Sequence, residues 1–121
     1  MDACAHDSVK GSDTFLDFIA KQVMHMRDAF GVPLAFMLMN SFSTSQDTLE
    51  ALAKYPDLPT ASLGGLEFQQ NKAPKVTAED LSPADWPANP GMEWCPPGHG
   101  DLYPAMLGSG TLDKLLAKGY K

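Results

Sequence analysis

The chain has 121 residues, enough for one modest hydrophobic core, and its 44% hydrophobic and 20% charged residues are a globular balance. The formal net charge of -6 disfavours nucleic acid as a partner, and the longest apolar run, residues 32–39, is too short to span a membrane. The first residues lack the basic and apolar regions of a signal peptide, so we expect a cytoplasmic location.

A first helix is predicted from residue 14 to residue 30. Residues 1–11, which precede it, are polar and unpatterned, and we expect them to be disordered or foreign to the rest of the chain. Apolar residues then recur at spacings of three and four and form one stripe: Phe15, Ile19, Val23, Met26 and Phe30. Thr14 followed by Asp17 predicts a capping box, and Gly31 is a suitable end for the helix.

The next apolar run, residues 34–39, predicts a strand. The run is continuous rather than alternating, so we expect both of its faces to be buried, as in a central parallel strand flanked by helices. A second helix is predicted over residues 45–54, with Thr44 as its cap and with three inward residues: Leu49, Leu52 and Ala53. Strand, loop and capped helix are half of a βαβ unit, which indicates an α/β fold.

The remaining residues predict short elements around a long connection. Residues 66–69 are expected to form a second strand, and the proline-rich stretch 71–97 is either a long functional loop or a small hairpin. Pro104 suits the first turn of a short helix. Ser109 is the predicted cap of a last helix, with Gly119 past its end and with three inward residues: Leu112, Leu115 and Leu116. A parallel sheet would need a returning strand after this helix, so we expect a truncated fold.

The segment from Glu93 to Asp101 carries the densest cluster of chemically active residues. Gly98 and Gly100 allow the backbone to approach a ligand closely, which puts His99 at the tip of a narrow loop as a donor to a sugar or a phosphate. An exposed loop histidine with no ligand explains the same pattern. Three residues of this segment also have metal-ligand chemistry, although without a standard zinc spacing: Cys95, His99 and Asp101.

Two further positions are candidates for ligand contacts. The side-chain amide of Gln70 offers a donor and an acceptor, which complement the N3–H and the neighbouring carbonyl of uracil; a solvated turn is the alternative. Met39 ends the predicted strand 34–39, and ligands of open α/β sheets bind at the carboxyl ends of strands.

Several segments together resemble the UTP-glucose-1-phosphate uridylyltransferase family over roughly residues 12–121. They occur in the family order and at family-like spacing: Thr14–Asp17, Leu38–Phe42, Asp47–Thr48, Gln70–Asn71, Pro74–Lys75, Glu93–Tyr103 and Gly108–Gly110. The combination of Met-Asn-Ser-Phe with Trp-Cys-Pro-Pro-Gly-His-Gly-Asp is specific, and its wording is closest to bacterial, actinobacterial-type members.

The resemblance implies a fold and a set of site residues. The fold would be a partial Rossmann-like nucleotide-diphospho-sugar transferase, a glycosyltransferase A-like three-layer α/β sandwich truncated at both ends, with residues 12–121 as part of the catalytic domain. Gln70 would read the uracil, Gly98 would lie against the base or ribose, and His99 would contact the glucose 1-phosphate or UDP-glucose. Met39 would lie near the start of the uridine pocket. The resemblance assigns no catalytic residue and no metal ligand to this segment.

The implied reaction joins UTP and glucose 1-phosphate to give UDP-glucose and pyrophosphate, with Mg²⁺ as the cofactor. The glycine-rich loop, the phosphate-binding lysine and the metal-binding aspartate of the family have no counterpart here. We therefore expect the isolated chain to release no pyrophosphate from the two substrates. Two alternatives remain: a non-catalytic module that binds nucleotides or sugar phosphates, and a relative that makes UDP-N-acetylglucosamine.

Overall fold

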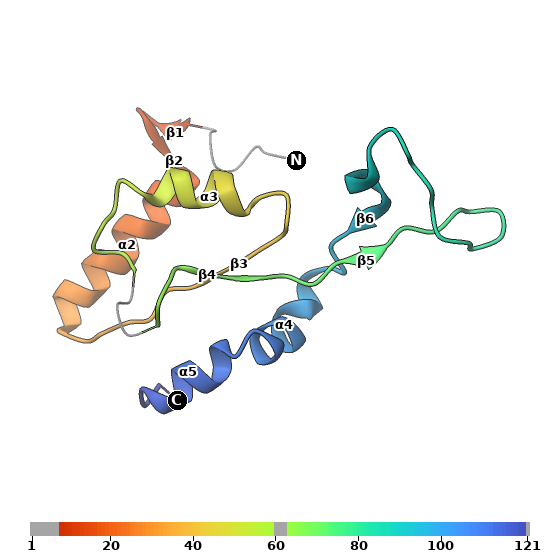
Figure 1. Ribbon diagram of the computed structural model, residues 1–121. Coiled ribbons are helices and arrows are strands. Elements are labelled where there is room, and N and C mark those ends of the chain that lie inside the picture. Colours follow the sequence, from red (N-terminus) through yellow and green to blue (C-terminus); the bar gives the residue numbers. More distant parts are fainter. Residues whose placement is uncertain (1–7, 60–62, 121) are drawn as a thin grey trace.

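The computed structural model describes residues 8–59 and 63–120. Helices α2 and α3 lie on one side of two paired strands, β5 and β6 extend away from them, and α4 and α5 run along the opposite side (Figure 1). The strands are β1 (Ser8–Lys10), β2 (Asp13–Thr14), β3 (Leu38–Asn40), β4 (Glu67–Gln69), β5 (Ala73–Pro74) and β6 (Trp94–Cys95). The helices are α2 (Phe15–Phe30), α3 (Ser45–Leu52), α4 (Leu102–Gly108) and α5 (Thr111–Ala117), with 3-10 turns η1 at Pro90–Glu93 and η2 at His99–Asp101. None of these helices is long and apolar enough to cross a bilayer.

Helix α2 confirms the predicted start and end of the first helix. The Asp17 backbone N–H donates to Thr14 Oγ1 over 3.3 Å, and the Thr14 backbone N–H donates to Asp17 Oδ2 over 2.7 Å, which is a capping box. Gly31 ends the helix in the left-handed conformation at φ 62°. Before the helix, β1 pairs with β2 in an antiparallel hairpin, where the sequence analysis expected no structure; residues 1–7 lie outside the described residues.

The predicted inward stripe of α2 is wrong for its end residues. Phe15 and Phe30 are 58% and 72% exposed, and Ile19, in the middle of the stripe, is exposed as well. The buried residues are Asp17, Ala20 and Val23, so Val23 alone of the predicted stripe is buried. The face of α2 that packs toward α3 is determined by the small Ala20 and by the polar contacts of Asp17. Both residues lie between the bulky apolar positions in the sequence. The buried face predicted from the apolar spacing is therefore rotated slightly from the face that is buried in the structure.

The buried core joins α2, α3 and the strand pair. Its members are Ala20, Val23, Leu52, Leu58 and Leu66, with half-buried Leu34, Phe36 and Leu38 packed against them. Strands β3 and β4 are parallel, with Met39 opposite Phe68, which confirms a parallel strand in this region. The strand is shorter than predicted and ends later, at Asn40. Its pairing begins only where the Leu38 N–H donates to the Leu66 carbonyl oxygen over 2.7 Å.

The second helix forms as predicted, but its cap and its buried face differ. The Thr44 side chain does not cap α3; its Oγ1 accepts instead from the Ser41 backbone N–H over 3.2 Å, which tightens the loop after β3. Leu52 is buried as expected, whereas Leu49 is 37% exposed and Ala53 is exposed. Thr48 takes the second buried position, one helical turn before Leu52.

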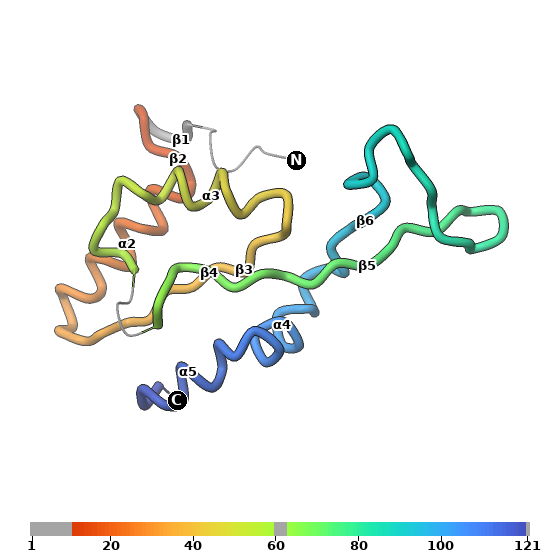
Figure 2. Tube along the Cα trace, in the orientation of Figure 1, coloured from red at the N-terminus to blue at the C-terminus, as the bar shows by residue number. Residues whose placement is uncertain are grey.

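The long connection is a hairpin excursion, one of the two alternatives predicted. Strands β5 and β6 pair antiparallel at its base, and Val76 bridges to Pro83 further out. Figure 2 shows this loop leaving the strand pair and returning to the start of α4. Pro104 lies in the first turn of α4, as predicted.

The last helix has a different cap from the one predicted. Gly110, at φ 71°, precedes α5, while the Ser109 hydroxyl contacts Thr111 instead. Leu116 is 58% exposed rather than inward. Gly119 follows the helix at φ 83°, which confirms it as the residue past the end.

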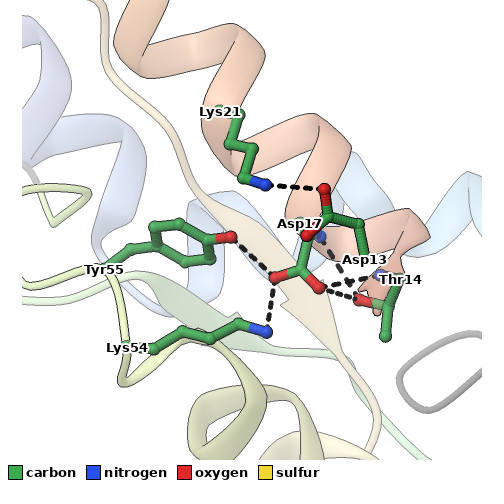
Figure 3. Close-up of polar contacts among 6 residues, drawn as sticks. All are labelled: Asp13, Thr14, Asp17, Lys21, Lys54 and Tyr55. Carbon is green, nitrogen blue, oxygen red and sulfur yellow. Dashed lines mark hydrogen bonds and ion pairs between the residues drawn. The ribbon is translucent and has the colours of Figure 1, made fainter. Parts of the chain in front are cut away.

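A buried carboxylate joins α2 to the end of α3 (Figure 3). Asp17 is 1% exposed, and its Oδ1 accepts from Lys54 Nζ over 2.6 Å and from the Tyr55 hydroxyl over 2.7 Å. Hydrogen bonding from Lys54 and from the Thr14 backbone holds the pKa of Asp17 well below its usual value despite burial. The pKa of Tyr55 is raised to about 12, mainly by burial and secondly by the hydrogen bond to Asp17. The capping residue of α2 is therefore also its anchor to α3.

We predict that Asp17→Asn lowers the free energy of unfolding by about 2–3 kcal/mol, because the buried site keeps its donors and loses the charge that satisfies them. A carboxyl with a lowered folded-state pKa stabilises fully above its unfolded value, and this contribution fades as the pH falls below about 4. Urea unfolding followed by circular dichroism across this range tests both effects. Asp28→Asn, an exposed position on the same helix, is the control. Equal stability of the two variants would contradict the role of Asp17.

Candidate functional site

The carboxyl ends of the two parallel strands lie side by side and lead into polar loops. The Gln70 backbone N–H, just past β4, donates to the carbonyl oxygen of Asn40 at the end of β3 over 2.8 Å. The Asn40 side chain is 7% exposed and contacts Glu67. Both strands therefore end at the same edge, where ligands of parallel α/β folds bind.

The loop before α4 packs directly onto this edge. Gln70 Nε2 donates to the carbonyl oxygen of Gly98 over 2.8 Å. Beside it, Asp101 accepts twice from Asn71, at Oδ2 from the backbone N–H over 2.8 Å and at Oδ1 from Nδ2 over 2.9 Å. Asp101 is 9% exposed, so its carboxylate is buried at one end of these hydrogen bonds, while Asn71 is exposed at the other. Two segments about 30 residues apart thus form one surface.

An open hollow of about 430 Å³ adjoins this contact. Its lining comes from the loop after β3 and from the end of β4: Phe42, Gln69, Gln70, Asn71 and Lys72. Phe42 is 39% exposed, so an aromatic surface stands beside the amides. Lys72 Nζ lies 4.4 Å from the centre of the Trp94 ring, a cation–π distance, which holds the cation near the hairpin base. The hollow combines an aromatic wall, amide groups and one cation.

The structure brings together two of the four residues predicted for the site. Gln70 and Gly98 are in direct contact. His99 follows Gly98 as an exposed residue in η2, so its backbone lies beside Gln70. Met39 is half-buried within β3 opposite Phe68 and is not among the residues that line the hollow.

The possible metal ligands do not gather. Among residues 8–59 and 63–120, no group of three histidine, cysteine, aspartate or glutamate side chains is arranged to hold a metal ion. Cys95 instead directs its thiol to the Ala73 carbonyl oxygen at 3.6 Å, across the β5–β6 pair, and Asp101 is occupied by Asn71.

Sequence reasoning did not identify the partners that position the site. The sequence indicated Asp101 only as a possible metal ligand, and Phe42, Asn71 and Lys72 only as parts of longer segments. The available signal was a carboxylate, Asp101, three residues after a glycine turn, together with an Asn next to Gln70. The contact between Asp101 and Asn71 depends on the pairing of β3 and β4, and the residues next to either one in the sequence do not predict it.

The arrangement is a mixed α/β fold with polar loops at the carboxyl ends of two parallel strands. The model of the UTP--glucose-1-phosphate uridylyltransferase family matches residues 4–121, and the chain belongs to this family. It is 41% identical over 112 residues to the Solanum tuberosum UTP--glucose-1-phosphate uridylyltransferase, covering 92% of this chain and 23% of that protein. A probable enzyme of the same name from Schizosaccharomyces pombe is 37% identical, with 92% and 22% covered.

Solved structures agree with this membership. The Trypanosoma brucei UDP-glucose phosphorylase superposes with a TM-score of 0.86 at 45% identity, over 99% of this chain and 26% of that one. The S374F mutant of Leishmania major UDP-glucose pyrophosphorylase, in complex with UDP-glucose, gives 0.88 at 46% identity, over 99% and 25%. The chain therefore spans about a quarter of the length of these relatives. The bacterial-type detail of the sequence resemblance stays a prediction.

We predict that Gly98→Ala destabilises the chain by about 1–3 kcal/mol, because Gly98 has φ 108°, a conformation that an alanine adopts only with strain. The matched control is Gly108→Ala in α4, where φ is not positive and the added Cβ meets nothing within 4 Å. That change should be neutral or stabilise by about 0.5–1 kcal/mol. Urea unfolding of both variants makes the comparison, and an equal response at the two glycines would argue against strain at Gly98.

Proposed function

We propose that this chain is part of a uridylyltransferase that makes UDP-glucose and pyrophosphate from UTP and glucose 1-phosphate. The observation that carries the proposal is the contact between Gln70 and Gly98 at the carboxyl ends of β3 and β4, in a chain of this family. The relatives above are named for glucose 1-phosphate or UDP-glucose, which favours glucose over N-acetylglucosamine and catalysis over a binding-only module.

Gln70 is the proposed reader of the uracil. Gly98 offers only a carbonyl oxygen at the contact, so the amino group of the Gln70 amide must face it, and Oε1 is left for a ligand. Nε2 also keeps a second N–H. An amide oxygen beside an N–H complements the N3–H and the neighbouring carbonyl of uracil. The exposed ring of Phe42 supplies an apolar wall to the same hollow.

The loop after Gly98 is the proposed site for the sugar phosphate. His99 is exposed and adjoins the Gln70 contact through its backbone, so a ligand whose base lies on Gln70 can extend its phosphates toward the imidazole. Met39, half-buried next to the end of β3, would contribute through the shape of the strand end rather than by lining the hollow.

The proposed chemistry is an in-line displacement, in which a phosphate oxygen of glucose 1-phosphate attacks the α-phosphorus of UTP and pyrophosphate leaves. In such reactions the protein mainly positions the reactants and screens charge. This chain would hold the base through Gln70 and orient the sugar phosphate through His99. Mg²⁺ would neutralise charge on the phosphates, and the family resemblance rather than any residue cluster here supports it.

Three further expectations belong to the same proposal. The mixed α/β arrangement would be part of a Rossmann-like, glycosyltransferase A-like sandwich, since β3 and β4 are parallel and helices lie on both sides of them. Residues 12–121 would belong to one catalytic domain. A cytoplasmic location stays a prediction.

The direct test is a chimera in which this chain replaces the matching 112 residues of the Solanum tuberosum relative. We expect the chimera to form UDP-glucose from UTP and glucose 1-phosphate. Gln70→Ala should raise KM for UTP and weaken base selectivity, at a cost of about 1–3 kcal/mol for an unpaired base group. His99→Ala should raise KM for glucose 1-phosphate more than KM for UTP.

Gln22→Ala and His25→Ala, exposed on α2, are the matched controls and should change neither KM. A chimera that folds, as shown by thermal unfolding, but makes no UDP-glucose would contradict the proposed function. Unchanged base selectivity in Gln70→Ala would remove Gln70 as the base reader. Equal changes in both KM values for His99→Ala would make His99 a structural residue of the loop.

A further inference from the structure

The contacts between the β4 end and the 98–101 loop close into a ring. Asp101 accepts from the backbone N–H and from the side-chain amide of Asn71, at 2.8 and 2.9 Å. The Asp101 backbone N–H donates to the Gly98 carbonyl oxygen over 3.2 Å, and Gln70 Nε2 donates to the same oxygen over 2.8 Å. Because Gln70 and Asn71 are neighbours in the chain, these four residues form one closed hydrogen-bonded circuit.

This ring determines which way the Gln70 amide faces. The Gly98 carbonyl oxygen has two lone pairs, and both meet donors, one from Asp101 and one from Gln70. A flipped Gln70 would bring its own oxygen against this carbonyl, two acceptors face to face. The amide is therefore held with Nε2 toward Gly98 for as long as the loop stays in place. The loop is held there by the buried carboxylate of Asp101, which is 9% exposed.

A glutamine with a fixed amide can tell uracil from cytosine. Uracil presents a donor at N3 and an acceptor at O4, whereas cytosine presents an acceptor at N3 and a donor at N4. A freely rotating glutamine amide reads either base by turning over. When Gln70 is held with Nε2 on Gly98, a cytosine in the uracil position brings acceptor against acceptor and donor against donor. Such mismatched polar groups are what makes hydrogen-bonding sites selective.

We propose that Asp101 is a positioning residue for nucleotide specificity: through Asn71 and Gly98 it fixes the amide orientation of Gln70, so that the site accepts uracil and rejects cytosine. Asp101 need not contact the ligand, because both carboxylate oxygens are occupied by Asn71. The proposal rests on the proposed function in one respect, the position of the base on Gln70. The ring itself is a property of the chain.

The first test measures the ring without any ligand. Nuclear magnetic resonance relaxation of side-chain amides in the 121-residue chain should give Gln70 Nε2 a higher order parameter than Gln22, an exposed glutamine on α2. Asp101→Asn should lower the Gln70 value toward that of Gln22, since an amide in place of the carboxylate accepts only one of the two Asn71 bonds. Equal order parameters for the two glutamines in the unmutated chain would overturn the proposal, whatever the function.

The second test measures discrimination in the chimera, with UTP and CTP as competing nucleotides. Asp101→Asn should lower the ratio of kcat/KM for UTP over CTP by about tenfold or more. Asn71→Ala, which removes one bond and keeps the backbone N–H, should give an intermediate decrease. Asp85→Asn, the same chemical change at an exposed hairpin position, should leave the ratio unchanged.

The outcomes separate the two proposals. A role confined to stability would reduce the use of both nucleotides equally, so an unchanged ratio in Asp101→Asn and Asn71→Ala would overturn the positioning role and leave the proposed function standing. An unmutated chimera that folds and uses neither nucleotide contradicts the proposed function, while the ring is still judged by the order parameter of Gln70. A decreased ratio with a lowered order parameter supports both.

Discussion

The double hydrogen bond from Asn71 to the buried Asp101 carboxylate is the contact on which the candidate site depends. Between these two residues the chain forms the whole hairpin excursion and returns, and only then starts α4. The β5–β6 pairs narrow the base of the excursion, and the Asp101 contact fixes its return. Hydrogen bonds to an ionised carboxylate are stronger than those between neutral groups, and here two of them join the same pair of residues. The loop containing Gly98 and His99 therefore lies next to the end of β4.

A second carboxylate has the same role for the helices. Asp17 closes the capping box of α2 and accepts from Lys54 and Tyr55 at the end of α3. Because a buried charge is costly unless it is fully paired, each helix restricts where the other can lie. The core between them is small and includes the buried Ala20 of α2 and Leu52 of α3. The strand pair that ends at the site therefore rests on helices joined by polar contacts as much as by apolar packing.

The elements of the fold were predictable where the signal is local. The capping box of Thr14 and Asp17, the end at Gly31 and the first turn at Pro104 each involve residues within one helical turn. The buried faces were less predictable, because they depend on partners far away in the chain. Phe15 and Leu116 continue a helical stripe yet are exposed, and Thr48 is buried where Leu49 was expected. Periodicity locates a helix better than it orients one.

The candidate site follows the same division. The chemistry of Gln70, Gly98 and His99 and a family resemblance identified these residues as candidates. The contact between Gln70 and Gly98 could not be predicted from the sequence. A hydrogen bond across 28 residues depends on the parallel register of β3 and β4 and on the path of the hairpin. Asp101 shows the limit most clearly, since an aspartate after Gly-His-Gly has the local signature of a turn. Its role became visible only when Asn71 was seen opposite it.

The most direct measurement is a crystal structure of the chimera with UDP-glucose bound. We expect the uracil N3–H and a neighbouring carbonyl to lie within hydrogen-bonding distance of the Gln70 amide. Gln70 Nε2 should still contact the Gly98 carbonyl oxygen, and the glucose phosphate should lie toward His99. A nucleotide bound away from the β4 end, or a uracil with no contact to Gln70, would contradict it.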